Sequence, residues 1–245
     1  MKPYLFVDLD DTLFQTIRKC PPSDQLKDAA LGRNGSVLSF MSSNQQTLFN
    51  VLCAAMRLIP TTARSYDAFK RVLLPFHEGA ILDYGGVILD RAGQVDPQWD
   101  AVIRSQAQKS ASDLEELCRS IQEFATRTAP ELSVRIISDF GIDMYIVIKH
   151  PQAHHQTLNR LHEECVLHVT PPGFYVHFND NNIAIIPDFL NKAHAVRFYI
   201  ENKIHPGGSP YMTLGMGDSF SDLSFMKLCD YLIVPGTSQI ARNLS

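Results

Sequence analysis

The stretch FVDLDDTLF, residues 6–14, places three carboxylates within four positions directly behind a short apolar run. That run, YLFV at residues 4–7, is β-branched and aromatic, which predicts a short buried strand that ends where the carboxylates begin. Acidic side chains this close repel one another and raise each other's pKa unless a cation lies among them. The stretch therefore predicts a strand whose carboxyl end holds a cation or a cationic substrate.

Strand and helix patterns alternate on either side of a different middle region. The first strand is followed by a helical pattern over residues 42–56 and by a second strand pattern in RLIPTTAR, which starts at residue 57 and ends at Thr61 and Thr62. Strand, helix and strand in this order predict a βαβ unit with a parallel sheet. The same alternation returns in residues 188–245, where FLNKAHAVRFYIEN reads as a helix and YMTLGMGD as a strand. The fold class predicted from these patterns is α/β.

The middle of the chain reads as a separately folded insert. A hairpin pattern, AILDYGGVILD at residues 80–90, precedes it. The insert then shows the order helix, two strands, helix, two strands, which predicts an antiparallel sheet with helices on one face. We therefore predict an α/β core domain made of residues 1–90 and 188–245, and an inserted α+β domain made of residues 91–187.

Two local predictions concern the segment after the first strand. Residues 20–35 are polar and contain two prolines and two glycines, which predicts a loop or an extended flap. In the helix that follows, Ser42 or Ser43 is expected to be the N-cap. Leu48, Val51, Leu52 and Ala55 are expected on its apolar face.

Composition and charge argue against several classes of partner. The 245 residues carry a net charge of −4, which leaves no basic footprint for nucleic acid. No apolar run approaches the roughly 18 residues that a transmembrane helix needs. The five cysteines are dispersed without a C-x-x-C pair, which favours reduced thiols and a cytoplasmic location. We therefore expect a cytoplasmic globular protein that binds neither nucleic acid nor a membrane.

Polar residues follow several of the predicted strands. In open parallel sheets, ligands bind beyond the carboxyl ends of the strands. Asp8 and Asp10 follow the first strand, Thr62 follows the second, and Asp218 and Asp222 follow the strand in YMTLGMGD. Four carboxylates at one sheet edge repel one another unless a hard divalent cation joins them, and all-oxygen ligation suits Mg²⁺. The sequence therefore predicts a Mg²⁺ site at this edge.

A metal held by carboxylates favours a phosphoryl group as a further ligand. Such a site needs a cation and a hydrogen-bond donor for the phosphoryl oxygens, and Lys192 and Thr62 are the candidates.

Four short segments carry a resemblance to a known family. DLDDT, TTAR, NKAHAV and GMGDSFSD resemble the four ordered motifs of the haloacid-dehalogenase-like (HAD) superfamily and together span residues 8–222. The resemblance implies a Rossmann-like parallel core with a C2-type cap inserted between the second and third motifs. The order of elements in the insert resembles the C2b subtype of sugar-phosphate phosphatases of the trehalose- and sucrose-phosphate type.

The resemblance also implies roles for the carboxylates. Asp8 matches the nucleophile that forms an aspartyl-phosphate. Asp10 matches the general acid and base, and its backbone carbonyl is expected to join Asp8, Asp218 and Asp222 around Mg²⁺. Asp11, between the motif residues, is expected to be a turn residue without direct chemistry.

The remaining motif residues are expected to contact the substrate. Thr62 and Lys192 match a hydroxyl and a lysine that serve catalysis and bind the phosphoryl group. Thr61 directly precedes Thr62 and is the alternative hydroxyl, and Ala193 stands where relatives have glycine. Arg64 is expected to bind substrate through the phosphate or to touch the cap, with an ion pair at a helix start as the alternative.

The function that the resemblance implies is Mg²⁺-dependent hydrolysis of a small phosphomonoester, with a sugar phosphate as the expected substrate. Two alternatives stay open: a phosphomutase of the same fold, and a non-catalytic binding or regulatory protein.

Overall fold

A computed structural model of the chain describes residues 2–22, 25–152, 154–179, 182–206 and 211–243. The chain divides into two compact units, a core unit of Met1–Asp100 with Asn191–Ser245 and an inserted unit of Ala101–Leu190. The sequence-based boundaries lie at residues 91 and 187. Residues 91–100 stay with the core unit because Trp99 is buried there and its indole N–H donates to the Gly85 carbonyl, 2.9 Å away.

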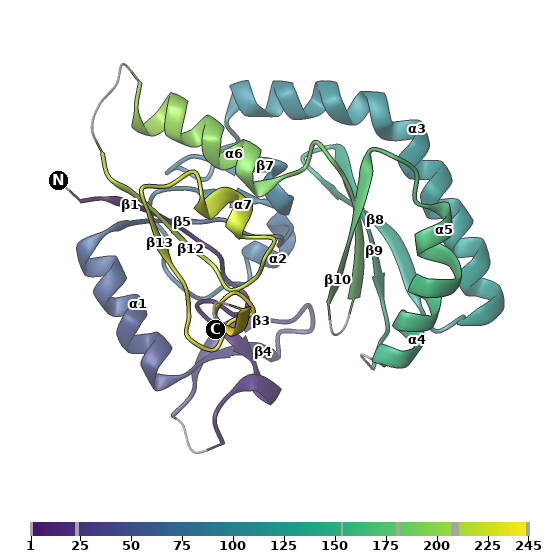
Figure 1. Cartoon of the computed structure of the whole chain (residues 1–245), viewed down its shortest axis with the longest axis horizontal. Coiled ribbons are helices and arrows are strands. Elements are labelled where there is room, and N and C mark those ends of the chain that lie inside the picture. Colours follow the sequence, from purple (N-terminus) through teal and green to yellow (C-terminus); the bar gives the residue numbers. More distant parts are fainter. Residues whose placement is uncertain (1, 23–24, 153, 180–181, 207–210, 244–245) are drawn as a thin grey trace. The chain divides into compact units, whose positions relative to one another are not determined.

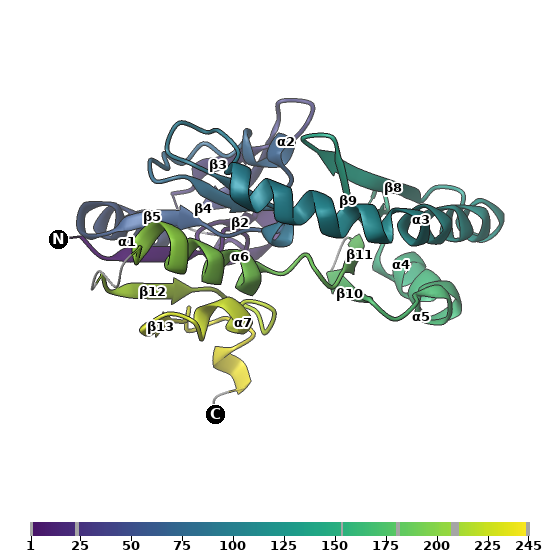
Figure 2. The same ribbon diagram turned by 90° about the horizontal axis from the view of Figure 1, so that it is seen from above.

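The core unit is built on a parallel sheet. Among the described residues its strands are β1 (Tyr4–Val7), β5 (Arg57–Pro60), β12 (Thr213–Met216) and β13 (Tyr231–Ile233), in the order β13-β12-β1-β5 (Figures 1 and 2). All residues of β1 are buried, and Val7 pairs with Met216 on one side and Pro60 on the other. The predicted α/β class with a parallel sheet is confirmed.

Helices cover both faces of this sheet. They are α1 (Ser43–Ala55), α6 (Lys192–Tyr199), which continues into a π-helical turn at Ile200–Ile204, and α7 (Leu223–Met226). Leu5 and Val7 point to the face that α1 covers, whereas the Phe6 ring meets Tyr199 of α6 edge to face at 5.7 Å. Figure 1 shows α1 and α6 on opposite sides of the strands, which gives three layers.

Helix α1 begins as predicted but buries only part of the predicted face. Ser42 is the N-cap, and it forms a capping box with Gln45. The buried residues are Phe49 and Leu52, while Leu48 and Val51 are exposed. The predicted face is confirmed for Leu52 and wrong for Leu48, Val51 and Ala55, because the helix is oriented by Phe49, whose ring packs edge to face on Phe76 at 5.9 Å.

Residues 20–35, predicted as a loop or an extended flap, contain one strand of a small antiparallel sheet. Strands β2 (Gln15–Thr16), β3 (Lys27–Leu31) and β4 (Val37–Met41) pair antiparallel in the order β2-β4-β3, with a 3₁₀ turn at Ile17–Lys19 after β2. Strand β3 also exchanges backbone hydrogen bonds with the chain that follows α2 (Tyr66–Phe69). Buried Ala29 and Ala30 pack in the core, so tertiary contact rather than local propensity makes this strand.

The predicted hairpin is present next to the start of α6. Strands β6 (Ala80–Leu82) and β7 (Val87–Leu89) pair antiparallel around a turn at Asp83–Gly85. Gly85 has a φ of +101°, and a Cβ on it would lie 2.5 Å from the Asn191 carbonyl oxygen. Only glycine allows this close approach.

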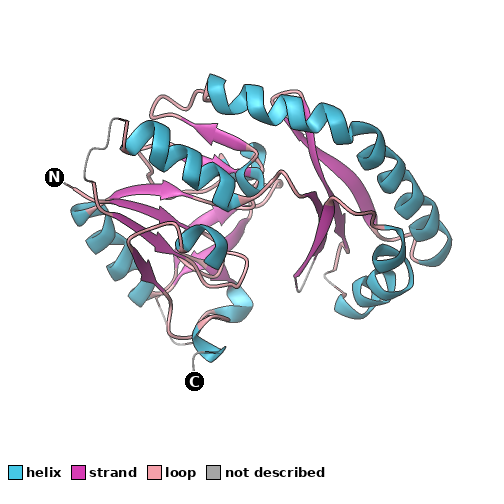
Figure 3. Ribbon diagram, turned by 45° about the horizontal axis from the view of Figure 1, so that its top comes forward, coloured by secondary structure: helices cyan, strands magenta, loops and turns pink. Residues whose placement is uncertain are grey.

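The inserted unit is an antiparallel sheet with helices on one face, as predicted (Figure 3). Helix α3 (Pro97–Thr128), which begins in the core unit, leads into it. Its further elements are β8 (Ser133–Asp139), β9 (Ile142–Lys149), α4 (His155–Leu161), α5 (Leu167–Val169), β10 (Phe174–Asn179) and β11 (Asn182–Pro187). A π-helical turn at His162–Val166 joins α4 to α5, and the strand order is β10-β11-β9-β8.

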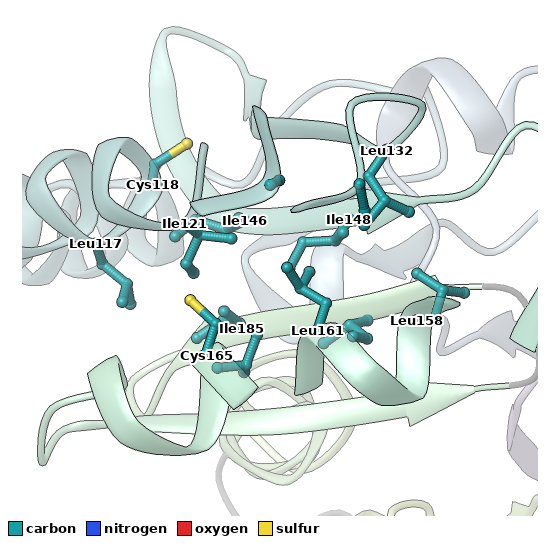
Figure 4. Packing of buried hydrophobic residues seen from close by; sticks show 14 of the residues in the cluster. Leu117, Cys118, Ile121, Leu132, Ile146, Ile148, Leu158, Leu161, Cys165 and Ile185 are labelled. Atoms are coloured by element: carbon teal, nitrogen blue, oxygen red, sulfur yellow. The ribbon is translucent and has the colours of Figure 1, made fainter. Parts of the chain in front are cut away.

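One apolar cluster holds this unit together. Leu117 and Ile121 of α3 and Leu161 of α4 pack on Ile146 and Ile148 of β9 (Figure 4).

No helix in the described part of the chain is long and apolar enough to cross a membrane. The chain's last described turn is a 3₁₀ turn at Ala241–Asn243.

Candidate active site

The strand register brings polar residues to one edge of the core sheet. Asp8 follows β1, Thr62 follows the neighbouring β5, and Asp218 and Asp222 follow β12 on the other side. The ladder continues one step past β1, since the Asp8 amide donates to the Met216 carbonyl at 2.9 Å. The carboxyl ends of three adjacent parallel strands therefore carry the predicted residues side by side.

Lys192 joins two of the carboxylates in a buried cluster. Its ammonium lies 2.7 Å from Asp8 Oδ1 and 2.8 Å from Asp222 Oδ1. All three side chains are at most 9% exposed. Burial by itself lowers the pKa of Lys192, but the Asp222 and Asp8 carboxylates overcome it and raise that pKa above its usual value. The ammonium is therefore held charged.

Negative charge nevertheless exceeds positive charge in this cluster. Burial raises the pKa of Asp8 well above its ordinary value, against the attraction of Lys192 and with the help of Asp222. The pKa of Asp218 rises to about 6 through burial and the charges of Asp222 and Asp11. Burial also disfavours ionised Asp222, yet Lys192 and Ser219 outweigh it and lower the pKa of that carboxyl.

A divalent cation fits this donor set. Asp8, Asp218 and Asp222 each offer one carboxylate oxygen, and these oxygens all lie within 4.8 Å of one another. Carboxylate oxygens are the ligands that Mg²⁺ prefers, and a cation among them relieves the repulsion that raises the pKa of Asp218. The side chain of Asp10 is not part of this group, so the expected metal contact through its backbone carbonyl stays a prediction.

Thr12 is a site residue to which the sequence analysis gave no role. Its buried hydroxyl lies 3.2 Å from Asp8 Oδ2 and 3.2 Å from Asp218 Oδ1, so it links the carboxylates of two strands. It is the last residue of DLDDT, and that motif position was the available signal. Asp11 has a φ of 62° and forms an exposed ion pair with Lys19, in keeping with a turn residue.

The two threonines after β5 have different hydrogen bonds. Thr61 donates its hydroxyl proton to the Ile59 carbonyl of its own strand at 3.2 Å. The Thr62 oxygen instead accepts the Arg64 backbone N–H at 3.1 Å, which leaves its proton for a phosphoryl oxygen. This contrast favours Thr62 over Thr61 as the hydroxyl that meets the substrate.

Arg64 contacts a predicted catalytic carboxylate. Its Nε lies 2.7 Å from Asp10 Oδ2 and its Nη2 lies 2.7 Å from Asp10 Oδ1. Burial works against the charge of Arg64, but the Asp10 carboxylate raises the pKa of the guanidinium above its usual value. Of the alternatives set out from the sequence, the ion pair is the one present here, and its partner is Asp10.

Local structure fixes Lys192 at the first turn of α6. Asn191 caps the helix, since its side-chain oxygen accepts the Ala193 N–H at 2.8 Å. The glycine turn of the β6–β7 hairpin lies against the Asn191 carbonyl. Ala193 is a good helix former in the first turn, so the missing glycine of the motif costs nothing here.

Asp222 is held by the loop that follows β12. The amide and hydroxyl of Ser219 donate to Asp222 Oδ2 at 3.2 and 2.7 Å. A Cβ at Gly217 would lie 2.6 Å from the Asp222 Cβ, so the loop closes tightly on this side chain. Ser219 and Gly217, in GMGDS, were not assigned from the sequence.

Comparison with known proteins identifies the fold. The sequence matches no protein-family model and no protein of curated function. The structure is similar to the trehalose-6-phosphate phosphatase C-terminal domain of C. albicans, with 16% identity, a TM-score of 0.61, and coverage of 92% of this chain and 73% of that one. It is also similar to the sucrose-phosphatase of Synechocystis, solved with sucrose and phosphate, with 19% identity, a TM-score of 0.51, and coverage of 100% and 87%.

A third similar structure is a trehalose-6-phosphate phosphatase related protein, with 15% identity, a TM-score of 0.53, and coverage of 96% of this chain and 88% of that one. At these levels of sequence identity, the structural similarity establishes the fold alone. The chain shares with these structures a Rossmann-like α/β core with an inserted α+β unit, and the predicted fold is confirmed.

Proposed function

We propose that this chain is a Mg²⁺-dependent phosphatase that hydrolyses a small phosphomonoester through an aspartyl-phosphate at Asp8. The observation that carries the proposal is the environment of the Asp8 carboxylate. Lys192 binds one of its oxygens, Thr12 lies within reach of the other, and the Asp218 and Asp222 carboxylates lie beside it. A buried carboxylate among a fixed ammonium and metal-binding acids is suited to attack phosphorus.

The reaction divides between two aspartates. An Asp8 oxygen forms a bond to phosphorus while the ester P–O bond breaks, and protonated Asp10 gives its proton to the departing alcohol oxygen. Ionised Asp10 then takes a proton from the water that attacks phosphorus. This second step frees the Asp8 carboxylate and releases inorganic phosphate with Asp10 protonated again.

The other residues neutralise the phosphoryl charge. Lys192 is already charged beside Asp8, and Thr62 has a proton to donate. Asp8, Asp218 and Asp222, with the expected Asp10 carbonyl, would hold Mg²⁺, which supplies Lewis-acid stabilisation of the phosphoryl oxygens when bound. Because the carboxylates otherwise repel an anionic substrate, activity is expected to require the metal.

A sugar phosphate is the substrate class that we propose. Two of the similar structures are phosphatases of disaccharide phosphates by name, trehalose-6-phosphate phosphatase and sucrose-phosphatase. The core-unit residues described above recognise a phosphoryl group and not the alcohol attached to it. We therefore propose that the inserted unit is the cap domain and selects the alcohol.

The test is phosphate release from p-nitrophenyl phosphate and from a panel of sugar phosphates, with Mg²⁺ and with EDTA. Asp8→Asn and Asp10→Asn are the test variants. Asp11→Asn is the matched control, because Asp11 lies in the same turn with a φ of 62°, which asparagine also adopts.

Metal-dependent release of inorganic phosphate that Asp8→Asn abolishes and Asp11→Asn retains would support the proposal. Transfer of the phosphoryl group to a second site on the sugar without release would indicate a phosphomutase instead. A folded protein that binds Mg²⁺ and turns over no phosphomonoester would contradict the proposal and favour a binding protein.

A further inference from the structure

We propose that Arg64 is a positioning residue that orients Asp10 for proton transfer and acts only through that carboxylate. The inference rests on the proposed function, in which Asp10 donates a proton to the leaving alcohol and later accepts one from water. It differs from the expectation that Arg64 binds the substrate phosphate.

The contact between the two side chains fixes the orientation of the carboxylate. Arg64 Nε and Nη2 each lie 2.7 Å from a different oxygen of Asp10. Two parallel N–H···O bonds from a planar guanidinium set both the distance and the plane of a carboxylate, whereas a single lysine ammonium sets only a distance. Asp10 is otherwise on a half-exposed turn, where its side chain is 51% exposed.

Arg64 is itself held rigidly. Its side chain is only 12% exposed, and its guanidinium carbon lies 5.0 Å from the centroid of the buried Phe14 ring, a cation–π contact. Its backbone N–H donates to the Thr62 hydroxyl, and its carbonyl accepts the Asp83 N–H at 2.9 Å. The arginine is therefore a fixed support that holds the half-exposed Asp10 carboxylate.

This arrangement is compatible with proton transfer. Each carboxylate oxygen offers two lone pairs, and the bidentate contact uses one on each oxygen. The other lone pair of one oxygen can hold the proton that passes to the alcohol oxygen as the ester P–O bond breaks. The proton taken from water in the second step returns to that position, so Arg64 keeps its contacts throughout.

The contribution of the Arg64–Asp10 ion pair to folding stability is too small to explain its presence. An ion pair with a half-exposed partner contributes little to folding, typically about 0–1 kcal/mol. The two guanidinium nitrogens that face Asp10 are already engaged with it, which leaves phosphate binding to Lys192 and Thr62. Orientation of the acid is the role that remains.

The experiment compares substrates that differ in their need for an acid. An alkyl leaving group such as that of glucose 6-phosphate needs a proton, whereas p-nitrophenolate leaves without one. We expect Arg64→Gln to lower kcat/KM about 100-fold on the sugar phosphate, within the range of a general acid, and by less than about threefold on p-nitrophenyl phosphate. Arg64→Lys is expected to fall between wild type and Arg64→Gln.

A double-mutant cycle and a product-inhibition assay complete the test. If Arg64 acts only through Asp10, Arg64→Gln adds no further loss in an Asp10→Asn background. The inhibition constant of inorganic phosphate stays within about twofold of wild type. Arg160→Gln is the control for loss of an arginine from an ion pair, because Arg160 of α4 forms an exposed ion pair with Glu164 in the turn that follows.

Three results would overturn the inference. An equal loss on both substrates with weaker inhibition by phosphate would assign Arg64 to phosphate binding. Losses that multiply in the double variant would show that it acts independently of Asp10. Unaltered kcat/KM in Arg64→Gln would show a contact without a catalytic role. An inactive wild-type protein would instead overturn the proposed function.

Discussion

Two cations meet carboxylates at the same sheet edge, but their surroundings differ. Lys192 is buried with Asp8 and Asp222, and none of the three is more than 9% exposed. Arg64 is also largely buried, but its partner Asp10 is half exposed. Removing one partner of a buried pair leaves an uncompensated charge, whereas a pair that reaches solvent is worth little to folding. Stability and chemistry are therefore expected to be coupled at Lys192 and separable at Arg64.

The largest expected effect is that of Lys192→Met. It leaves the Asp8 and Asp222 carboxylates facing each other without the ammonium, and breaking such a buried pair costs about 3–5 kcal/mol. We also expect at least about a 1,000-fold loss of phosphatase kcat/KM, since the phosphoryl oxygens lose their cation. Urea unfolding in EDTA and steady-state kinetics measure the two effects.

Lys227→Met is the control for this change, since Lys227 is exposed at the end of α7. A loss of stability below about 1 kcal/mol in Lys192→Met would show that the buried cluster is not held together as described.

The next effect concerns the backbone that fixes Lys192. In Gly85→Ala, the new Cβ meets the Asn191 carbonyl in a turn with a φ of +101°. We expect a loss of about 3 kcal/mol from clash and strain, with a fall in activity because α6 starts at the next residue. The control is Gly93→Ala, where φ is +73° but no atom lies within 4 Å of the new Cβ, so strain alone costs about 1 kcal/mol. Equal losses of stability in Gly85→Ala and Gly93→Ala would show that the close contact with the Asn191 carbonyl does not help to fix Lys192.

Burial of Asp218 beside other carboxylates predicts a pH dependence of the metal-free protein. The pKa of Asp218 is about 6 in the folded state, above the value of about 3.9 for an unfolded chain. The folded state therefore holds the proton more tightly, so this contribution to stability is complete below about pH 4 and is lost as the pH rises through about 6.

The measurement is the free energy of unfolding in EDTA across this window, for wild type and Asp218→Asn. Wild type is expected to lose about 2 kcal/mol relative to the variant between pH 4 and pH 7. Mg²⁺ should reverse the loss above pH 6, because metal binding favours the ionised carboxylate. A difference between the two proteins that stays constant with pH would contradict the assigned charge balance.

The smallest expected effect is the change in stability in Arg64→Gln. Because Asp10 is half exposed, we expect a loss of no more than about 1 kcal/mol, even though turnover of sugar phosphates falls. Urea unfolding of the same sample used for kinetics checks this. A loss comparable to that of Lys192→Met would erase the contrast between the two pairs.

The elements that were predictable from sequence are those with a local signal. Period-two and apolar patterns predicted β1 and the hairpin of β6 and β7, and turn residues placed the breaks between them. Asp8 follows β1 and Asp218 follows the neighbouring β12, so the alternation of strand and helix was enough to place both residues at one edge.

The features that were missed depend on tertiary contact. Strand β3, with the sequence KDAAL, has little intrinsic β preference and forms because its alanines are buried against the core. The exposed side of α1 carries Leu48 and Val51, which helical periodicity alone assigned to the core. The pairing of Arg64 with Asp10 joins residues 54 positions apart, and no local pattern reports such a contact.

The most direct test of the central claim is a search for the phosphoryl group on Asp8. The protein is mixed with Mg²⁺ and a phosphomonoester that it hydrolyses, and the reaction is quenched in acid during steady state. The peptides of the quenched protein are then mapped by mass spectrometry. We predict one added phosphoryl group on the peptide that contains Asp8, and none in Asp8→Asn. A phosphoryl group on another residue, or full turnover by Asp8→Asn, would contradict the account.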